Sequence, residues 1–153
     1  MDSPRPIIFV KRDSTTPSNP HEGNACLPNI PVVSIIDDDE FVRSATNRLV
    51  RSLGFIAPTF ASADEFLRSP HLNDTSCVIS DVQMPGISGL EMQSMLIAKG
   101  KNVPIIFITA FPDERIRALA MKAGAVCFLS KPFEGSTLIE CINNALRTQS
   151  NQR

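Results

Sequence analysis

Four short, nearly continuous apolar runs constrain the fold of this chain more than any other feature. They lie at 32–36, 77–80, 105–109 and 126–129, with amphipathic stretches between them. Strands of a parallel sheet are covered on both faces, so they read as continuous apolar runs rather than as alternating patterns. A weaker fifth run, at 56–60, contains Pro58, which cannot donate to a strand ladder. We therefore expect βαβ units, with this fifth strand at an edge of the sheet.

The segments between the runs carry signals for helix ends. Two begin with the capping-box pattern Ser-x-x-Glu, at Ser62 and Ser88. Two others end at Gly54 and Gly124, since glycine is favoured just after a helix. A fourth helix is expected at about 113–123 and a fifth at about 136–147. The first helix is expected to turn its apolar stripe inward, namely Val42, Ala45, Leu49 and Leu53.

Five strands and five helices joined by short right-handed crossovers predict an α/β fold with a doubly wound parallel sheet. With the Pro58 strand at the margin, the expected strand order is 2-1-3-4-5. Six of the twelve prolines lie before residue 32, in a stretch rich in Ser, Thr and Asn that is too polar to form a core. We expect a disordered arm at 1–30, a folded domain at 31–148 and a polar tail at 149–153.

Charge and hydropathy exclude several classes of function. The chain has 15 basic and 16 acidic residues, a formal net charge of -1, so it lacks the basic excess that grips phosphate backbones. Direct nucleic-acid binding is not expected. The apolar runs are far shorter than the roughly 20 residues of a membrane span, and the patch at 7–10 is too short for a secretory signal. We expect a cytoplasmic protein with no membrane contact.

The four cysteines, Cys26, Cys77, Cys127 and Cys141, show no metal-binding spacing. Three of them fall in apolar segments, where a free cysteine packs as a small hydrophobic side chain. We therefore expect reduced, structural thiols rather than disulfides.

Candidate functional residues follow the strands, because ligands of such sheets bind beyond the carboxyl ends of the strands. The first strand ends in Asp37 and Asp38, the third in Asp81, the fourth in Thr109 and the fifth in Lys131. Acidic residues after a strand are often only helix N-terminal charges, which is how we interpret Asp39 and Glu40.

The residue types at this rim point to phosphoryl chemistry. Several close carboxylates either raise a pKa or gather a cation, and oxygen ligands without Cys or His suit Mg²⁺. A lysine is well suited to meeting an arriving anion. A carboxylate nucleophile, Mg²⁺, a hydroxyl and a lysine together predict phosphoryl transfer onto Asp81, with charge stabilisation as the main catalytic effect.

These residues resemble the receiver domains of two-component response regulators. The segments that carry the resemblance are IIDDDEFVRS, SDVQMPGISG, FITAF and GAVCFLSKPF, and the last is closest to FixJ-like receivers. The intervals between Asp38, Asp81, Thr109 and Lys131 also agree with that family. The resemblance covers about 32–147 and implies a flavodoxin/CheY-like fold of five βα units.

The resemblance implies a role for each matching position. Asp81 would accept a phosphoryl group from a histidine kinase or a histidine phosphotransfer protein, and Lys131 would pair with Asp81 and then with the phosphate. Asp38, Asp81 and the carbonyl of Gln83 would hold Mg²⁺, with Asp37 acting mainly through water.

The resemblance also implies a conformational switch. Thr109 would move to a phosphate oxygen and the Phe128 ring would turn into the vacated space, changing the face formed by 113–123, 126–129 and 136–147. The Lys131-Pro132 bond is expected to be cis. An aromatic residue in a sheet is more often only packing, and for Phe128 that interpretation stays open. Phosphorylation-dependent dimerisation and contact with a downstream protein effector are possible outputs.

Other functions compete with a signalling receiver. An aspartate-nucleophile phosphohydrolase would share the nucleophile and Mg²⁺, but it needs a second Asp two residues later, where this chain has Gln83. An interaction module that never carries phosphate would be expected to lack part of the residue set. We expect a signalling domain rather than an enzyme, acting alone or as the receiver fragment of a longer DNA-binding transcription regulator.

Overall fold

The computed structural model describes residues 30–151. The expected arm at 1–30 lies outside the described residues except for Ile30, and so do the last two residues of the expected tail.

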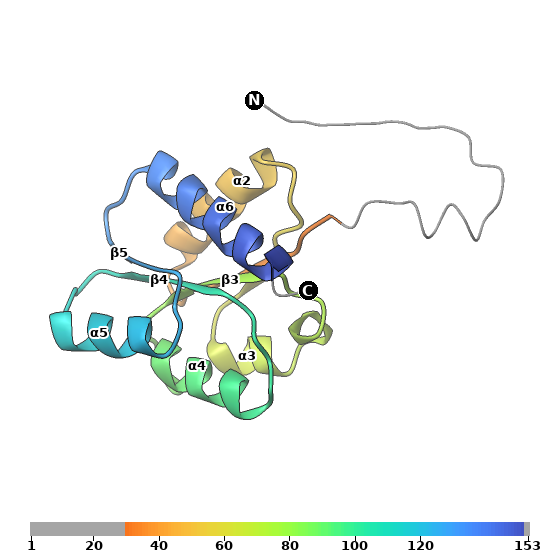
Figure 1. The fold of residues 1–153 in the computed structure, drawn as a ribbon. Helices are drawn as coiled ribbons and strands as arrows, with labels where there is room; N and C mark the ends of the chain where they lie inside the picture. Colours follow the sequence, from red (N-terminus) through yellow and green to blue (C-terminus); the bar gives the residue numbers. More distant parts are fainter. Residues whose placement is uncertain (1–29, 152–153) are drawn as a thin grey trace, which may run out of the picture.

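Five parallel strands form one sheet in the order β2-β1-β3-β4-β5, which confirms the predicted topology (Figure 1). The strands are β1 (Val33–Ile36), β2 (Thr59–Phe60), β3 (Cys77–Asp81), β4 (Ile105–Thr109) and β5 (Cys127–Ser130). The prediction of an edge strand near Pro58 is also confirmed. Pro58 lies just before β2, and only its carbonyl takes part in pairing, accepting a 2.9 Å hydrogen bond from the Ile35 N–H.

Helices cover both faces of the sheet, as Figure 1 shows. One face carries α2 (Glu40–Ser52) and α6 (Gly135–Asn151), and the other carries α3 (Ala63–Leu67), α4 (Gly89–Ala98) and α5 (Glu114–Lys122). A short 3-10 helix, η2 (Pro70–Leu72), follows α3. The sheet therefore separates two hydrophobic cores, as expected of a doubly wound fold.

Each core is built from alternate residues of the same strands. Phe107 on β4 lies in one core with Phe66 of α3 and Met92 of α4, whereas its neighbour Ile106 lies in the other core with Ile142 of α6 and Val50 of α2. All six side chains are fully buried. Burial of a side chain of this size stabilises the fold by roughly 1.5–3 kcal/mol.

The predicted helix starts are formed by capping side chains. Ser88 and Glu91 make a complete capping box at the start of α4. At α3 the Ser62 hydroxyl caps the Glu65 N–H, but the Glu65 carboxylate accepts from the Ala61 N–H, one residue before the expected partner. Both arrangements satisfy backbone N–H groups that have no partner within the helix.

The predicted inward face of the first helix is partly wrong. Thr46 and Val50 are the buried residues of α2, whereas Ala45 and Leu53 are exposed. The rotation of α2 is fixed by polar contacts that an apolar pattern does not reveal: Asn47 Nδ2 donates to the Ala57 carbonyl at 2.7 Å and Arg43 donates to the Asp37 carbonyl, also at 2.7 Å.

The expectation of unpaired thiols is wrong for two of the four cysteines. Cys127 on β5 and Cys141 on α6 form a disulfide, with Cα atoms 6.2 Å apart. The pairing arises because β5 and α6 pack together in one core, which sequence spacing does not show. Cys77 is a free, fully buried thiol, as expected, and Cys26 lies outside the described residues.

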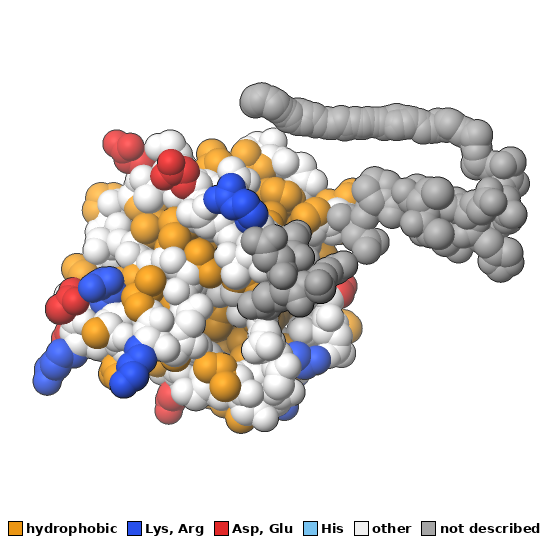
Figure 2. Space-filling model, viewed as in Figure 1, with side chains coloured by type: hydrophobic (Ala, Val, Ile, Leu, Met, Phe, Trp, Pro, Cys, Tyr) orange, Lys and Arg blue, Asp and Glu red, His pale blue; other side chains and the backbone are white. Residues whose placement is uncertain are grey.

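The surface of the described residues mixes charge types. On the face shown in Figure 2, basic and acidic side chains are interspersed among apolar and uncharged ones. Within residues 30–151, no helix is both long and apolar enough to cross a membrane.

Candidate functional site

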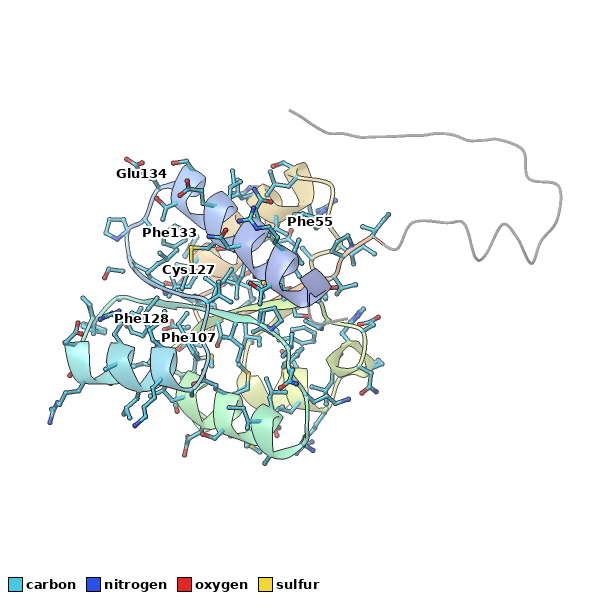
Figure 3. All side chains as sticks on the ribbon, viewed as in Figure 1. Phe55, Phe107, Cys127, Phe128, Phe133 and Glu134 are labelled. Carbon is cyan, nitrogen blue, oxygen red and sulfur yellow. A yellow bond between two sulfur atoms is a disulfide. The ribbon has the colours of Figure 1, made fainter. Side chains whose placement is uncertain are left out.

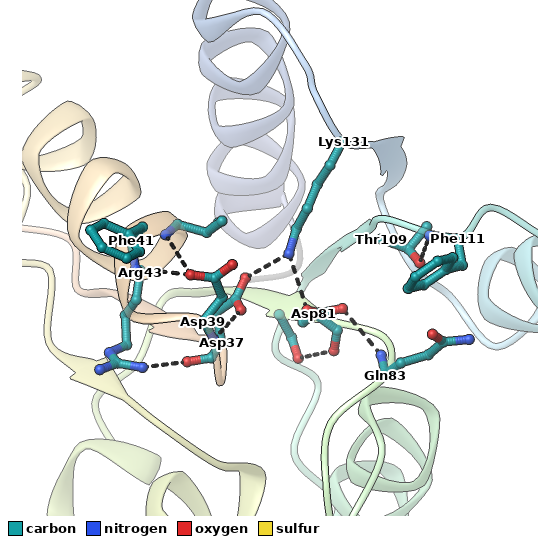
Figure 4. Close-up of polar contacts among 11 residues, drawn as sticks. Asp37, Asp39, Phe41, Arg43, Asp81, Gln83, Thr109, Phe111 and Lys131 are labelled. Carbon is teal, nitrogen blue, oxygen red and sulfur yellow. Dashed lines mark hydrogen bonds and ion pairs between the residues drawn. The ribbon is translucent and has the colours of Figure 1, made fainter.

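Three predicted site residues are in direct contact beyond the carboxyl ends of the strands (Figure 4). Lys131 Nζ lies 3.2 Å from Asp37 Oδ2 and 3.1 Å from Asp81 Oδ2. The two carboxylates are nearly inaccessible to solvent, whereas the amine is partly exposed. The Lys131 ammonium group thus bridges two buried carboxylates that would otherwise repel each other.

The sheet register brings these residues together. On adjacent strands Ile36 pairs with Ser80, so Asp37 and Asp81 leave β1 and β3 at the same level. Lys131 comes directly after β5, two strands away from β3, and its long side chain reaches across the end of β4. Its N–H donates to the Thr109 carbonyl at 2.8 Å, which extends the β4–β5 pairing by one residue. The Lys131-Pro132 peptide bond that follows is cis.

Asp37 is the more buried acid, with 1% of its surface exposed. Its Oδ1 accepts a 2.9 Å hydrogen bond from the Asp39 N–H. Burial raises the pKa of Asp37, and this outweighs the opposite effects of that hydrogen bond and of Lys131; the Asp81 charge raises it further. The ionised form of Asp37 is therefore less favoured than that of a free carboxyl group.

The pKa of Lys131 is also raised. Burial alone would lower it, but hydrogen bonds and charge attraction from Asp81 and Asp37 outweigh burial. The lysine is therefore held in its charged form at neutral pH.

Thr109 is buried at the end of β4, the strand between β3 and β5. Its Oγ1 accepts a 3.0 Å hydrogen bond from the Phe111 N–H. Phe107, two residues before Thr109 on the same face of β4, packs against Phe128 of β5 with ring centroids 6.4 Å apart. The Thr109 hydroxyl and the Phe128 ring thus lie along one face of the β4–β5 pair, the face on which Figure 3 shows Phe128 near Phe107. Phe128 is only partly buried.

The loop after Asp81 is held against the end of the sheet. The Gln83 N–H donates to Asp81 Oδ1 at 3.1 Å, and the Gly89 N–H donates to the Val82 carbonyl at 2.8 Å. A Cβ on Gly89 would lie 2.5 Å from the Asp81 carbonyl oxygen and 2.9 Å from a ring carbon of Phe107. Glycine is therefore required here for the close approach of α4 to β3.

The acidic group fits a hard divalent cation. Carboxylate oxygens of Asp37, Asp38 and Asp81 can all lie within 4.8 Å of one another, and Asp38 is exposed while the other two are buried. A set made only of oxygen donors, open to solvent on one side, is what Mg²⁺ prefers, because Mg²⁺ keeps several of its waters. The sequence-predicted ligands Asp37, Asp38 and Asp81 are thus brought together.

Arg43 is a site residue that the sequence reasoning missed. Its guanidinium donates a 2.7 Å hydrogen bond to the Asp37 carbonyl, which fixes the loop from β1 into α2 (Figure 4). Asp39 has two roles, since its side chain caps α2 while its N–H binds Asp37. The signal in the sequence was the position of Arg43, one helical turn after Asp39, which places its side chain near the acidic residues that follow β1.

Comparison with known proteins agrees with this geometry. The family model of the response regulator receiver domain matches residues 33–143. This chain belongs to that family. The resemblance stated from the sequence is thereby confirmed.

Relatives extend the comparison beyond the family model. Response regulator protein TodT of Pseudomonas putida is 42% identical over 122 residues, which is 80% of this chain and 54% of that protein. Transcriptional regulatory protein FixJ of Bradyrhizobium diazoefficiens is 39% identical over 115 residues, 75% of this chain and 56% of that protein. The chain therefore spans about half the length of these curated relatives.

Solved structures show the same fold. The response regulator StyR has a TM-score of 0.76 and 41% identity, with 82% of this chain and 63% of that chain covered. The structure of FixJ-N has a TM-score of 0.70 and 35% identity, with 78% and 96% covered. The FixJ-like character of this receiver, predicted from the segment at 124–134, is thereby confirmed.

Proposed function

We propose that this receiver accepts a phosphoryl group on Asp81 and passes the change on to another protein. The observation that carries this proposal is that Lys131 bridges Asp81 and Asp37. With Asp38, these two carboxylates form a cluster of oxygen donors, called the acidic group below. Asp81 ends the central strand of the sheet, and its carboxylate is held from both sides by the Lys131 amine and the Gln83 N–H. The nucleophile is therefore oriented before a donor arrives.

The proposed transfer uses groups of this chain and a phosphohistidine donor. An Asp81 oxygen attacks the phosphorus, a P–O bond forms, and the P–N bond to the donor histidine breaks as its imidazole leaves and is then protonated by solvent. Asp38, Asp81 and the Gln83 carbonyl would hold Mg²⁺, with Asp37 acting mainly through water, and the ion would supply positive charge that offsets the charge on the phosphoryl oxygens. Lys131 then pairs with the new phosphate.

The switch that follows involves β4 and β5. The Thr109 hydroxyl leaves the Phe111 N–H for a phosphate oxygen, and the Phe128 ring turns inward beside Phe107. This arrangement is supported by the shared face of these side chains and by the partial exposure of Phe128. The surface formed by α5, β5 and α6 would then differ between two packings, with the phosphate shifting their populations.

The donor is proposed to be a histidine kinase or a histidine phosphotransfer protein. Two exposed aromatic residues flank the acidic group: Phe41 at the start of α2, 87% exposed, and Phe111 after β4, 70% exposed (Figure 4). Exposed aromatic side chains around a polar site are typical of protein-binding surfaces. A partner held there would bring its phosphohistidine to Asp81. With a histidine kinase as the donor, the proposed location of this exchange is the cytoplasm.

A signalling role is proposed rather than turnover of phosphate esters. The position two residues after the proposed nucleophile holds Gln83, which has no acidic proton for a leaving group. The output is a protein effector or a second copy of the receiver. Because FixJ is named a transcriptional regulatory protein, an output domain that binds DNA in a longer regulator is a second candidate.

The first experiment tests the chemistry alone. The chain is incubated with acetyl phosphate and Mg²⁺, and phosphoryl uptake is read by intact mass. Uptake should be lost in Asp81→Asn and kept in Asp74→Asn, which removes an exposed carboxylate outside the acidic group. Equal uptake by both variants would overturn the assignment of Asp81. Release of inorganic phosphate at many turnovers per chain would favour the phosphohydrolase instead.

A second experiment separates partner docking from chemistry. Phe41→Ala should lower transfer from a phosphorylated histidine phosphotransfer protein by about tenfold, since truncating a central aromatic contact typically costs 1–2 kcal/mol. Uptake from acetyl phosphate should be unchanged. Equal loss with both donors would mean that Phe41 supports the acidic group rather than a docking surface.

A further inference from the structure

The Cys127–Cys141 disulfide joins the edge strand β5 to a helix on one face of the sheet. Cys127 lies in the same core as Cys141 and pairs in the sheet with Ile106, while its neighbour Phe128 lies in the opposite core (Figure 3). Because β5 is an edge strand, it pairs with β4 alone. The cross-link therefore holds β5 at the residue next to Phe128 and four residues before Lys131.

Cys127 differs from the other described cysteines in its burial. Cys127, on the edge strand, is only partly buried, whereas its partner Cys141 has 5% of its surface exposed. Cys77, on β3 in the same core, is fully buried, and burial raises the pKa of its thiol to about 12. Cys77 therefore lacks both the access and the thiolate that exchange requires.

We propose that Cys127 and Cys141 are a reversible redox site, at which low-molecular-weight thiols and disulfides open and close a covalent tie between β5 and α6. On closing, the Cys127 thiolate attacks a small disulfide and expels one thiolate. The Cys141 thiolate then attacks the mixed disulfide and expels the second. Two electrons pass from the chain to the small disulfide, which leaves as two thiols carrying the protons.

The position of the tie gives this site a structural consequence. The strand that it holds carries Phe128 and leads directly into Lys131, so the closed form should restrict movement of β5 relative to α6. The open form leaves β5 held by its pairing with β4 and by packing alone. The tie lies at residues other than those proposed for phosphoryl transfer, and its opening and closing need no phosphate.

The first test measures the redox state directly. The full chain carrying Cys26→Ser is equilibrated in glutathione buffers of graded thiol-to-disulfide ratio, acid-quenched, alkylated in denaturant and mapped by mass spectrometry. As the buffer becomes more oxidising, Cys127 and Cys141 should lose alkylation together and the chain should lose two hydrogens. Both changes should reverse when the thiol-to-disulfide ratio is reversed. Cys77 should be alkylated throughout. Cys127→Ser and Cys141→Ser should each abolish formation of the internal disulfide, whereas Cys77→Ala should leave it unchanged.

The second test measures the tie itself by hydrogen exchange on the oxidised and reduced chain, without phosphate or Mg²⁺. Amides of β5 should exchange at least about tenfold more slowly in the oxidised chain. Alkylation of both cysteines at every ratio would overturn the proposal. So would a disulfide that thiols cannot open in the folded chain, or equal exchange of β5 in both states. Each result is independent of whether Asp81 accepts phosphate.

Discussion

The N–H of Lys131 donates a 2.8 Å hydrogen bond to the carbonyl of Thr109, so the proposed phosphate-binding lysine and the proposed switch hydroxyl are joined through their backbones. The two residues follow neighbouring strands whose register pairs Thr109 with Ser130. A movement of either strand end must therefore displace the other. Their side chains nevertheless have different partners, since Lys131 binds the carboxylates and the Thr109 hydroxyl accepts from the Phe111 N–H.

The different partners of Thr109 and Lys131 predict that uptake and switching can be separated. Thr109→Val keeps the side-chain shape but removes the hydroxyl, and its effect on the free energy of unfolding should be about 1 kcal/mol or less. Phosphoryl uptake on Asp81 should persist, whereas phosphate-dependent protection of β5 amides in hydrogen exchange should be lost. Thr109→Ser should keep both properties. If the valine variant still shows the full change in protection, the hydroxyl is not the switch.

The burial of Asp37 predicts a pH-dependent gain in stability when its charge is removed. Its raised folded-state pKa gives stability that is fully present below the ordinary value of 3.8 and is lost as the pH rises through the folded value. In chelator and without Mg²⁺, Asp37→Asn should therefore unfold at a higher temperature than the wild type at pH 7, and the difference should shrink toward pH 3. Thermal unfolding followed by circular dichroism measures both.

Mg²⁺ should reverse the order of stability of the wild type and Asp37→Asn. A ligand that binds only the folded state stabilises it by RT ln(1 + [L]/Kd), about 2.7 kcal/mol at a hundredfold excess over Kd. The wild type should gain more than Asp37→Asn, because the variant has lost one carboxylate of the acidic group. Equal gains for both proteins would show that Asp37 contributes nothing to cation binding.

Two glycines offer a matched comparison of packing. Gly89→Ala should lower the free energy of unfolding by about 2 kcal/mol or more, since its Cβ would overlap the Asp81 carbonyl and the Phe107 ring. Gly135→Ala should be neutral or stabilising by up to about 1 kcal/mol, because its Cβ would meet Leu49 at an ordinary 3.6 Å in the first turn of α6. Urea unfolding of both variants provides the values. A mild effect at Gly89 would mean that α4 can shift away from β3.

The disulfide predicts a difference in stability between the oxidised and reduced chains. The bridged cysteines are 14 positions apart in the sequence, and for a loop of this size the loss of chain entropy in the unfolded state corresponds to about 3 kcal/mol. Urea unfolding with and without reductant should show this difference in the wild type. In Cys127→Ser the reductant should have no effect, and any remaining effect would have to come from another pair of cysteines.

Much of the fold could be predicted from the sequence because the local signals agree with one another. Continuous apolar runs identified the buried strands, and Pro58 marked an edge. The acidic residues and Lys131 were recognisable because each directly follows such a run. Parallel strands of one sheet bring those positions to the same end.

The features that escaped prediction depend on how elements pack. The rotation of α2 follows from Asn47 and Arg43, which bind backbone carbonyls of other segments. The link between Cys127 and Cys141 depends on the docking of α6 beside β5. Neither relation leaves a periodic pattern along the chain, so no reading of residue types at fixed spacing could have found it.

The contact between Lys131 and Asp37 joins residues 94 positions apart. During folding, Asp37 and Asp81 come together as soon as β1 pairs with β3, but their counterion is delivered only when β5 docks at the far edge of the sheet. Any partly folded form that lacks β5 therefore brings two carboxylates together with no lysine between them. Such forms are penalised electrostatically, so completion of the sheet and assembly of the site should occur in a single cooperative step.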